Sequence, residues 1–201
     1  MSDRPAVLIK VPVAERAGVV SCHQKVYDLV GRQDRPLWRK CPGYLLVLAR
    51  SAPGGFESKP YDPQPVIGQE STFDLLAEIS VSKQLTKEGR GRRVDPILDA
   101  RKRDPARSYD ELASEIGGEW LKRRSVRLGF ELISLVRHDY EVIEFVRQRQ
   151  MVRIGAIRYA GTLRVSNSEQ FKHTMLYGIG HSKAWGLGLL LCFKTKRDFG
   201  I

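Results

Sequence analysis

Histidine side chains are the first candidates for chemistry in this sequence of 201 residues, because an imidazole can accept or donate a proton near neutral pH. Four are present: His23, His138, His173 and His181. The three cysteines are widely separated and form neither a CxxC pair nor a zinc spacing with the histidines. We therefore expect no metal site and no cofactor, and cysteines that stay reduced in a cytoplasm.

A glycine-rich stretch near the C-terminus is the second candidate. Its four glycines fall within 11 residues, and His181 and Lys183 lie between the two glycine pairs; the glycines are Gly178, Gly180, Gly186 and Gly188. Glycine lets another backbone approach closely, and the lysine supplies a cation, so a phosphate backbone lying across this loop is the simplest functional interpretation. A tight turn would explain the same glycines. The pattern is neither a Walker loop nor a dinucleotide fingerprint.

The charge balance points to a polyanionic partner. Lys and Arg number 34 against 23 Asp and Glu, a net charge of +11, which favours nucleic acid first and an acidic membrane surface second. Residues 83–107 are the most basic stretch, and we expect a mobile arm or loop there that contacts RNA or DNA. A solvated linker is the alternative. We expect no signal peptide, and the apolar runs are too short to span a bilayer.

The first half of the chain predicts a strand, a helix and further strands. Residues 6–13 are rich in β-branched residues, and the helix that follows ends at Val30 before Gly31, with Ser21 as a possible N-cap. A turn at residues 41–43 joins two strands, residues 51–68 are expected to form a loop, and residues 72–82 a long strand. This order is the start of a ferredoxin-like unit.

The second half predicts a similar order of elements. Ser108 and Glu111 form a capping box for a helix to about Arg124, and Asn167 could cap a helix that Gly178 ends. Strands are expected over residues 126–137, 152–165 and 187–193, and residues 141–150 are ambiguous. The predicted fold is therefore α+β, with two tandem ferredoxin-like βαββαβ domains over residues 1–95 and 96–201.

Residues 178–190 carry a resemblance to a known family. They match every fixed position of the pattern G-x-G-x-x-K-x-x-G-x-G-L-L, with which CRISPR-associated endoribonucleases of the CasE subfamily end. Residues 73–83, followed by Arg92, Arg93 and Val94, also resemble the mid-chain strand and basic loop of that subfamily, which matures crRNA for the type I-E Cascade complex.

The resemblance implies two tandem RAMP domains and a basic face that holds an RNA hairpin from the CRISPR repeat. It also implies metal-independent cleavage at the 3′ base of that hairpin, in which the 2′-hydroxyl attacks the adjacent phosphorus and leaves a 2′,3′-cyclic phosphate. The protein would then stay bound to the crRNA and join the other Cascade subunits. A hairpin-binding subunit with slow or no cleavage is the alternative. A general RNA-binding protein of this fold has no RNP-type aromatic motif to support it.

The resemblance also assigns site residues. The family's catalytic histidine lies in the first helix, which selects His23; if Ser21 is the N-cap, the helix dipole would keep this imidazole neutral, as a base requires. Well-studied members carry a tyrosine three residues earlier, where this chain has Val20, so Tyr27, Lys25 or His181 could take its place. The expected catalytic residues are therefore His23 and Tyr27. The expected RNA contacts are Lys25, Lys83, Arg90, Arg92, Arg93, Arg147, Arg149, Arg153, Gly178, Gly180, His181, Lys183, Gly186 and Gly188.

Overall fold

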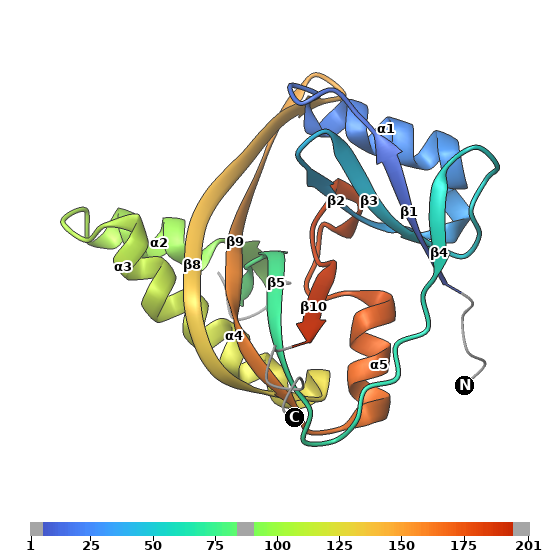
Figure 1. Ribbon diagram of the computed structural model, residues 1–201. Helices are drawn as coiled ribbons and strands as arrows, with labels where there is room; N and C mark the ends of the chain where they lie inside the picture. Colours follow the sequence, from blue (N-terminus) through green and yellow to red (C-terminus); the bar gives the residue numbers. More distant parts are fainter. Residues whose placement is uncertain (1–5, 84–90, 195–201) are drawn as a thin grey trace.

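Two four-stranded antiparallel sheets organise the protein in this computed structural model, which describes residues 6–83 and 91–194 (Figure 1). The first sheet has the strand order β2-β3-β1-β4, and α1 packs against it with Cys22 and Val26 in the core. Its elements are β1 (Val7–Pro12), α1 (Val19–Val30), β2 (Leu37–Cys41), β3 (Tyr44–Ala49) and β4 (Glu57–Pro60). This is the ferredoxin-like strand order, with residues 50–56 in place of the second helix.

The second sheet has the order β10-β5-β9-β8 and completes a full βαββαβ unit. Its strands are β5 (Glu70–Glu78), β8 (Phe130–Arg147), β9 (Gln150–Val165) and β10 (Leu190–Lys194). Between β5 and β8 lie α2 (Pro96–Arg103), α3 (Tyr109–Leu112) and α4 (Gly118–Ser125), and α5 (Ser168–Tyr177) connects β9 to β10. A π-helical turn over residues 113–117 joins α3 to α4, and a small hairpin pairs β6 (Val81–Lys83) with β7 (Arg92–Val94).

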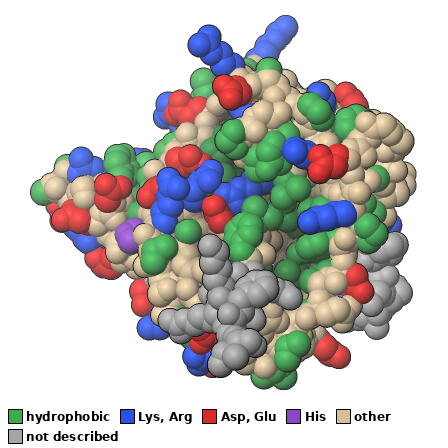
Figure 2. Space-filling view, viewed as in Figure 1, with side chains coloured by type: hydrophobic (Ala, Val, Ile, Leu, Met, Phe, Trp, Pro, Cys, Tyr) green, Lys and Arg blue, Asp and Glu red, His purple; other side chains and the backbone are tan. Residues whose placement is uncertain are grey.

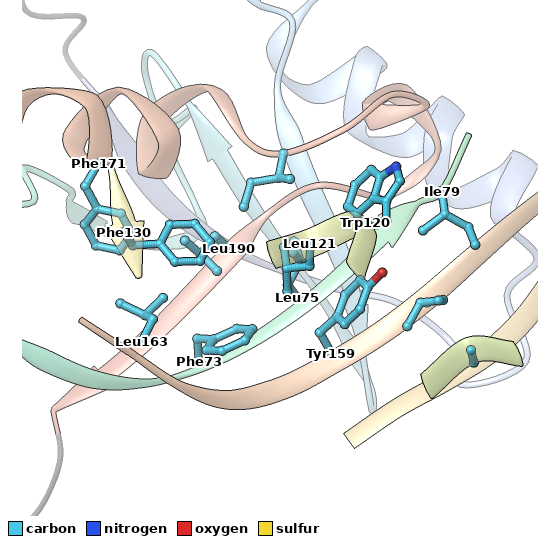
Figure 3. Close-up of a cluster of buried hydrophobic side chains, with 14 of the residues drawn as sticks. Phe73, Leu75, Ile79, Trp120, Leu121, Phe130, Tyr159, Leu163, Phe171 and Leu190 are labelled. Atoms are coloured by element: carbon cyan, nitrogen blue, oxygen red, sulfur yellow. The ribbon is translucent and has the colours of Figure 1, made fainter. Parts of the chain in front are cut away.

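The main core lies between the second sheet and its helices (Figure 3). Alternate residues of β5 and β9, such as Phe73, Leu75 and Tyr159, are buried because successive side chains of a strand point to opposite faces. The phenol of Tyr159 donates a hydrogen bond to the carbonyl of Gly117 at 3.0 Å, which satisfies the polar end of this buried ring. Phe130 meets Phe171 edge-on at 5.8 Å and holds α5 against the sheet.

The predicted fold class, α+β with tandem ferredoxin-like units, is confirmed. The assignment of the strand at residues 72–82 to the first unit is wrong, because β5 pairs with β9 and β10 in the second sheet. Residues 51–68 are also not all loop, since β4 pairs with β1. The domain boundary at residue 95 stays a prediction, and the change from one sheet to the other falls between β4 and β5.

Several local predictions are also settled by the structure. The capping box of Ser108 and the side-chain cap of Asn167 are confirmed. Residues 83–107 are not one loop, because β7 and α2 form within them, with Asp95 as the N-cap of α2. The N-cap of α1 is Gly18 rather than Ser21, whose hydroxyl donates to the Gly18 carbonyl instead.

Strands β8 and β9 form a long hairpin whose tip lies beside α1 (Figure 1). Residues 141–150, which the sequence leaves ambiguous, are therefore strand up to Arg147. The chain reverses at Gln148 and Arg149, both with positive φ, as in the two-residue turns that match the twist of a hairpin. Phe145 and Ile154 pack near this tip with Leu187 of the glycine-rich loop.

The glycine-rich loop packs tightly between the two units. A Cβ atom on Gly186 would lie 2.8 Å from the ring of Trp38, and one on Gly188 would lie 2.5 Å from the carbonyl oxygen of Ile179. The amide of Gly188 donates to the carbonyl of Leu76 at 2.7 Å, which ties the loop to β5. The glycines are thus required by close backbone packing at positive φ.

Replacing Gly186 with alanine is expected to lower the free energy of unfolding by about 1–3 kcal/mol, the range for an overpacked core. The added Cβ would meet the Trp38 ring, and the φ of +85° disfavours any side chain. Urea denaturation measures the effect. Gly54→Ala is the matched control, because nothing lies within 4 Å of its Cβ position; an equal stability of the two variants would contradict this account of the loop.

Candidate active site

His23 lies on α1 with its ring half-buried against the glycine-rich loop. Its Nδ1 lies 2.8 Å from the carbonyl oxygen of Ala184. A carbonyl oxygen only accepts hydrogen bonds, so Nδ1 carries the proton, and in the neutral ring Nε2 is left free to accept one. This geometry suits a general base. The helix dipole has no part in it, because α1 begins at Val19 and places His23 beyond the first turn.

Aromatic rings hold the His23 imidazole on two sides. Trp185 stacks on it with ring centroids 4.3 Å apart, and Tyr27 contacts it at 4.4 Å. Trp185 also contacts Phe145 of β8 at 4.2 Å, and the Arg147 guanidinium lies 5.7 Å from the Trp185 ring centre. The loop therefore joins α1 to the tip of the β8–β9 hairpin.

Sequence reasoning missed the positioning role of Trp185 and of the Ala184 carbonyl. That carbonyl also accepts a hydrogen bond from Nε1 of Trp38 at 3.0 Å. A backbone carbonyl has no signal in a sequence, whereas the tryptophan between the two glycine pairs is a visible one.

Tyr27 contacts the His23 ring, whereas Lys25 forms its hydrogen bond elsewhere. Burial raises the pKa of the Tyr27 phenol, with Arg32 as a smaller opposing influence, so the hydroxyl stays protonated and can donate a proton or a hydrogen bond. Lys25 instead donates to the carbonyl of Pro12 at 2.7 Å. Val20, where the resemblance leads us to expect a tyrosine, is 43% exposed.

Lys183 lines a cavity of about 650 Å³ together with Tyr27 and Ala184. Burial lowers the pKa of its amine, because a charged ammonium loses hydration there. The cavity adjoins His23, since Tyr27 packs on the imidazole and Ala184 accepts its hydrogen bond.

The tip of the β8–β9 hairpin carries three of the predicted arginines, of which Arg147 lies over the Trp185 ring. Arg147, Arg149 and Arg153 are all exposed, and Arg153 pairs with Glu144 at 2.8 Å. Figure 2 shows Lys and Arg side chains gathered over the middle of one face, beside hydrophobic ones. The tip thus offers exposed cations near Trp185 and His23.

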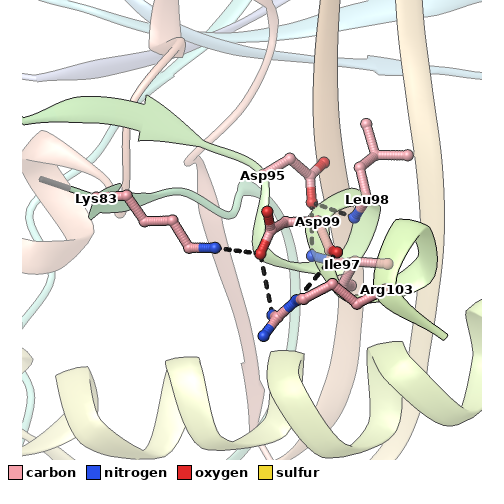
Figure 4. A network of polar contacts seen from close by, with 6 residues as sticks. All are labelled: Lys83, Asp95, Ile97, Leu98, Asp99 and Arg103. Atoms are coloured by element: carbon pink, nitrogen blue, oxygen red, sulfur yellow. Dashed lines mark hydrogen bonds and ion pairs between the residues drawn. The ribbon is translucent and has the colours of Figure 1, made fainter. Parts of the chain in front are cut away.

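A second basic group surrounds the β6–β7 hairpin. Lys83 pairs with Asp99 of α2, which also accepts from Arg103 at 3.0 Å (Figure 4). Lys83 is the main reason that the pKa of Asp99 is lowered. Arg92 and Arg93 are exposed on β7, and the predicted contact Arg90 lies outside the described residues.

His181 lies near this second basic group, because Arg93 is one of the charges around it. Partial burial is the first cause of its lowered pKa, and the nearby charge of Arg93 is the second, with Glu78 opposing them. His181 is exposed, whereas His23 is held between Trp185 and Tyr27. The structure therefore brings His23, Tyr27 and Lys183 together and places His181 near Arg93.

Residues 6–83 and 91–194 show neither a metal-binding cluster nor a membrane-spanning helix. They contain no group of three or more His, Cys, Asp or Glu side chains placed to hold a metal ion. In the same part of the chain, the helices are too short or too polar to cross a membrane.

Comparison with known proteins gives one family and several structures. The model of a family described as "CRISPR associated protein" matches residues 12–193. No curated protein matches the sequence at a significant level. The chain is similar to the CRISPR endoribonuclease Cse3 bound to a 19-nucleotide RNA, with 25% identity, a TM-score of 0.72, and coverage of 94% of this chain and 98% of that chain.

Two further likenesses show the same fold. Thermus thermophilus Cse3, bound to an RNA representing a pre-cleavage complex, is 22% identical with a TM-score of 0.70, covering 94% of this chain and 99% of that one. A chain of a CRISPR RNA-guided surveillance complex is 17% identical with a TM-score of 0.60, covering 94% and 100%. The chain therefore belongs to the CRISPR associated protein family, and the resemblance predicted from its glycine-rich loop is confirmed.

Proposed function

We propose that this protein is a metal-independent endoribonuclease that binds the CRISPR repeat hairpin and cleaves pre-crRNA at the 3′ base of that hairpin. The observation that carries the proposal is the hydrogen bond from His23 Nδ1 to the Ala184 carbonyl, which leaves Nε2 as a base beside exposed arginines. The similarity to Cse3 bound to RNA supports the substrate class.

In the proposed reaction, His23 Nε2 takes the proton of the 2′-hydroxyl while the 2′-oxygen attacks the adjacent phosphorus. The bond from phosphorus to the 5′-oxygen breaks, and the products are a 2′,3′-cyclic phosphate and a 5′-hydroxyl. A tyrosine phenol is protonated at neutral pH, and burial raises the pKa of Tyr27 further, so its hydroxyl can donate to the departing 5′-oxygen. Lys183 and Arg147 supply positive charge for the phosphorane, whose charge grows in the transition state.

The hairpin would be gripped through its shape and phosphates. A-form RNA offers a narrow major groove and exposed phosphates, which suit the arginines of the β8–β9 tip. Arg92, Arg93, Lys25, Lys83 and His181 would extend this basic surface, whereas the space beside the loop glycines, which the sequence suggested for the RNA backbone, is taken by the protein's own atoms. The similarity to a chain of a surveillance complex supports retention of the product with other Cascade subunits, in the cytoplasm where CRISPR RNA is made.

The second candidate is a hairpin-binding subunit with slow or no cleavage. The observation in its favour is Val20, which places an exposed apolar side chain where the resemblance leads us to expect a tyrosine. Both candidates use the same basic surface, and they differ in what His23 does.

His23→Ala is expected to reduce cleavage of labelled repeat RNA by about 10²–10⁴-fold, the usual contribution of a general base. The assay runs in EDTA, and a 2′-deoxy substitution at the scissile site should block the wild-type cut. Affinity for this uncleavable RNA should change little. His138→Ala is the control, because His138 lies opposite Tyr159 in the sheet, seven residues before the Phe145 that contacts Trp185. A cut that survives His23→Ala would remove His23 from the mechanism, and tight binding without any cut would favour the second candidate.

We expect the replacement of Arg147, Arg149 and Arg153 together with glutamine to weaken the salt dependence of hairpin binding. The slope of the logarithm of the binding constant against the logarithm of the salt concentration should fall by roughly one for each phosphate that is no longer neutralised. The reason is that each neutralised phosphate releases condensed counterions. Fluorescence anisotropy at several salt concentrations measures the slope. A triple variant of the exposed cations Lys122, Arg123 and Arg127 is matched in charge; an equal loss of slope in both would mean that the tip has no special role.

A further inference from the structure

The cavity beside His23 has a lining that the proposed cleavage does not yet use. Besides Tyr27 and Lys183, it is lined by Arg35, Arg50 and Tyr177. Its volume of about 650 Å³ falls within the range of small-molecule sites, and it is large enough for a nucleotide.

The charge of this lining suits an anion. Three cations, Lys183, Arg35 and Arg50, face one carboxylate, Asp34. Asp34 is buried, accepts a hydrogen bond from the amide of Arg50 at 2.8 Å and forms an ion pair with the Arg50 Nε at 3.4 Å, so the carboxylate is already engaged by the protein. Within residues 6–83 and 91–194, the side chains of Lys183 and Arg35 form no hydrogen bond or ion pair, which leaves two cations for a ligand.

Arg35 also has a strained backbone. Its φ of 48° and ψ of 58° place it in the left-handed region, which glycine and asparagine adopt more readily. The residue before a proline prefers an extended conformation, and Pro36 follows. Strained backbone of this kind clusters at functional sites, and the side chain of Arg35 is exposed.

Aromatic rings form another part of the same lining. Tyr27 contacts His23, and Tyr177 stacks on His173 at 4.3 Å while 37% of it stays exposed. A nucleobase can stack on such rings whatever its sequence. Proteins that bind single-stranded RNA combine cations with aromatic rings in this way.

We propose that this cavity holds the RNA strand on the 3′ side of the scissile phosphate, with Arg35 contacting a phosphate of that leaving strand. The inference rests on the proposed function. Trp185, on one side of His23, leads to Arg147 at the hairpin-binding tip, whereas Tyr27, on the other, lines the cavity. A strand that passes His23 from the RNA hairpin therefore enters the cavity after the cleavage site.

The test compares two RNAs by fluorescence anisotropy. One is the repeat hairpin with its natural 3′ extension and a 2′-deoxy nucleotide at the scissile site, and the other ends at that site. Arg35→Asn is expected to bind the extended RNA about tenfold more weakly, as for loss of one charged hydrogen bond, and to bind the shorter RNA like the wild type. Arg35→Lys should keep most of the affinity, because it keeps the charge.

Two controls separate this contact from folding and from general charge. The unfolding midpoint of Arg35→Asn should equal or exceed that of the wild type, because asparagine tolerates the left-handed region. Arg127→Asn removes one exposed cation from the turn after α4 and should leave the preference for the extended RNA intact.

Three results would overturn the inference. Arg35→Asn could bind the extended RNA like the wild type, it could lose the same affinity for both RNAs, or the wild type could show no preference for the 3′ extension. If the wild-type protein bound neither RNA, the proposed function and this inference would fail together, whereas normal cleavage with an unchanged Arg35→Asn would reject only the inference.

Discussion

The backbone carbonyl of Ala184 is the constraint on which the site depends, because it accepts hydrogen bonds from two different elements. Trp38 on β2 is almost fully buried, and an indole N–H buried without an acceptor costs about 1–3 kcal/mol. The demand of Trp38 for an acceptor thus helps to fix the carbonyl between β2 and α1. His23 Nδ1 donates to the same oxygen. The tautomer of the imidazole therefore depends on a carbonyl that the packing of Trp38 helps to position.

The placement of that carbonyl depends in turn on how the loop crosses between the two sheets. Gly186 lies against the Trp38 ring, and Gly188 contacts the backbone of Ile179 and bonds to Leu76 on β5. The loop is thereby fixed to β2 of the first sheet and to β5 of the second. The site exists only where the two ferredoxin-like units meet, so neither unit alone contains it.

Local signals predicted much of this structure. The capping box of Ser108, the cap of Asn167 and the helix end at Gly31 depend on neighbouring residues, and each was readable from the sequence. The partners of β5 were not, because its alternating pattern shows a half-buried strand without showing which sheet contains it. Lys183 was selected from the glycine-rich motif, and His23 from the family resemblance, which places a histidine in the first helix. Arg35 and the Ala184 carbonyl were missed, since a pocket formed by distant segments and a backbone acceptor leave no local pattern.

The acceptor for His23 belongs to the main chain, and this has a consequence for how the loop can vary. No substitution at position 184 removes a backbone oxygen, so this position can accept any side chain that fits the space. Gly186 and Gly188 have no such freedom, because a methyl group at either position would collide with the Trp38 ring or with the Ile179 carbonyl. Among relatives, identity should therefore concentrate in the glycines, which have no functional group, while the residue whose carbonyl orients the His23 ring can differ from one relative to the next.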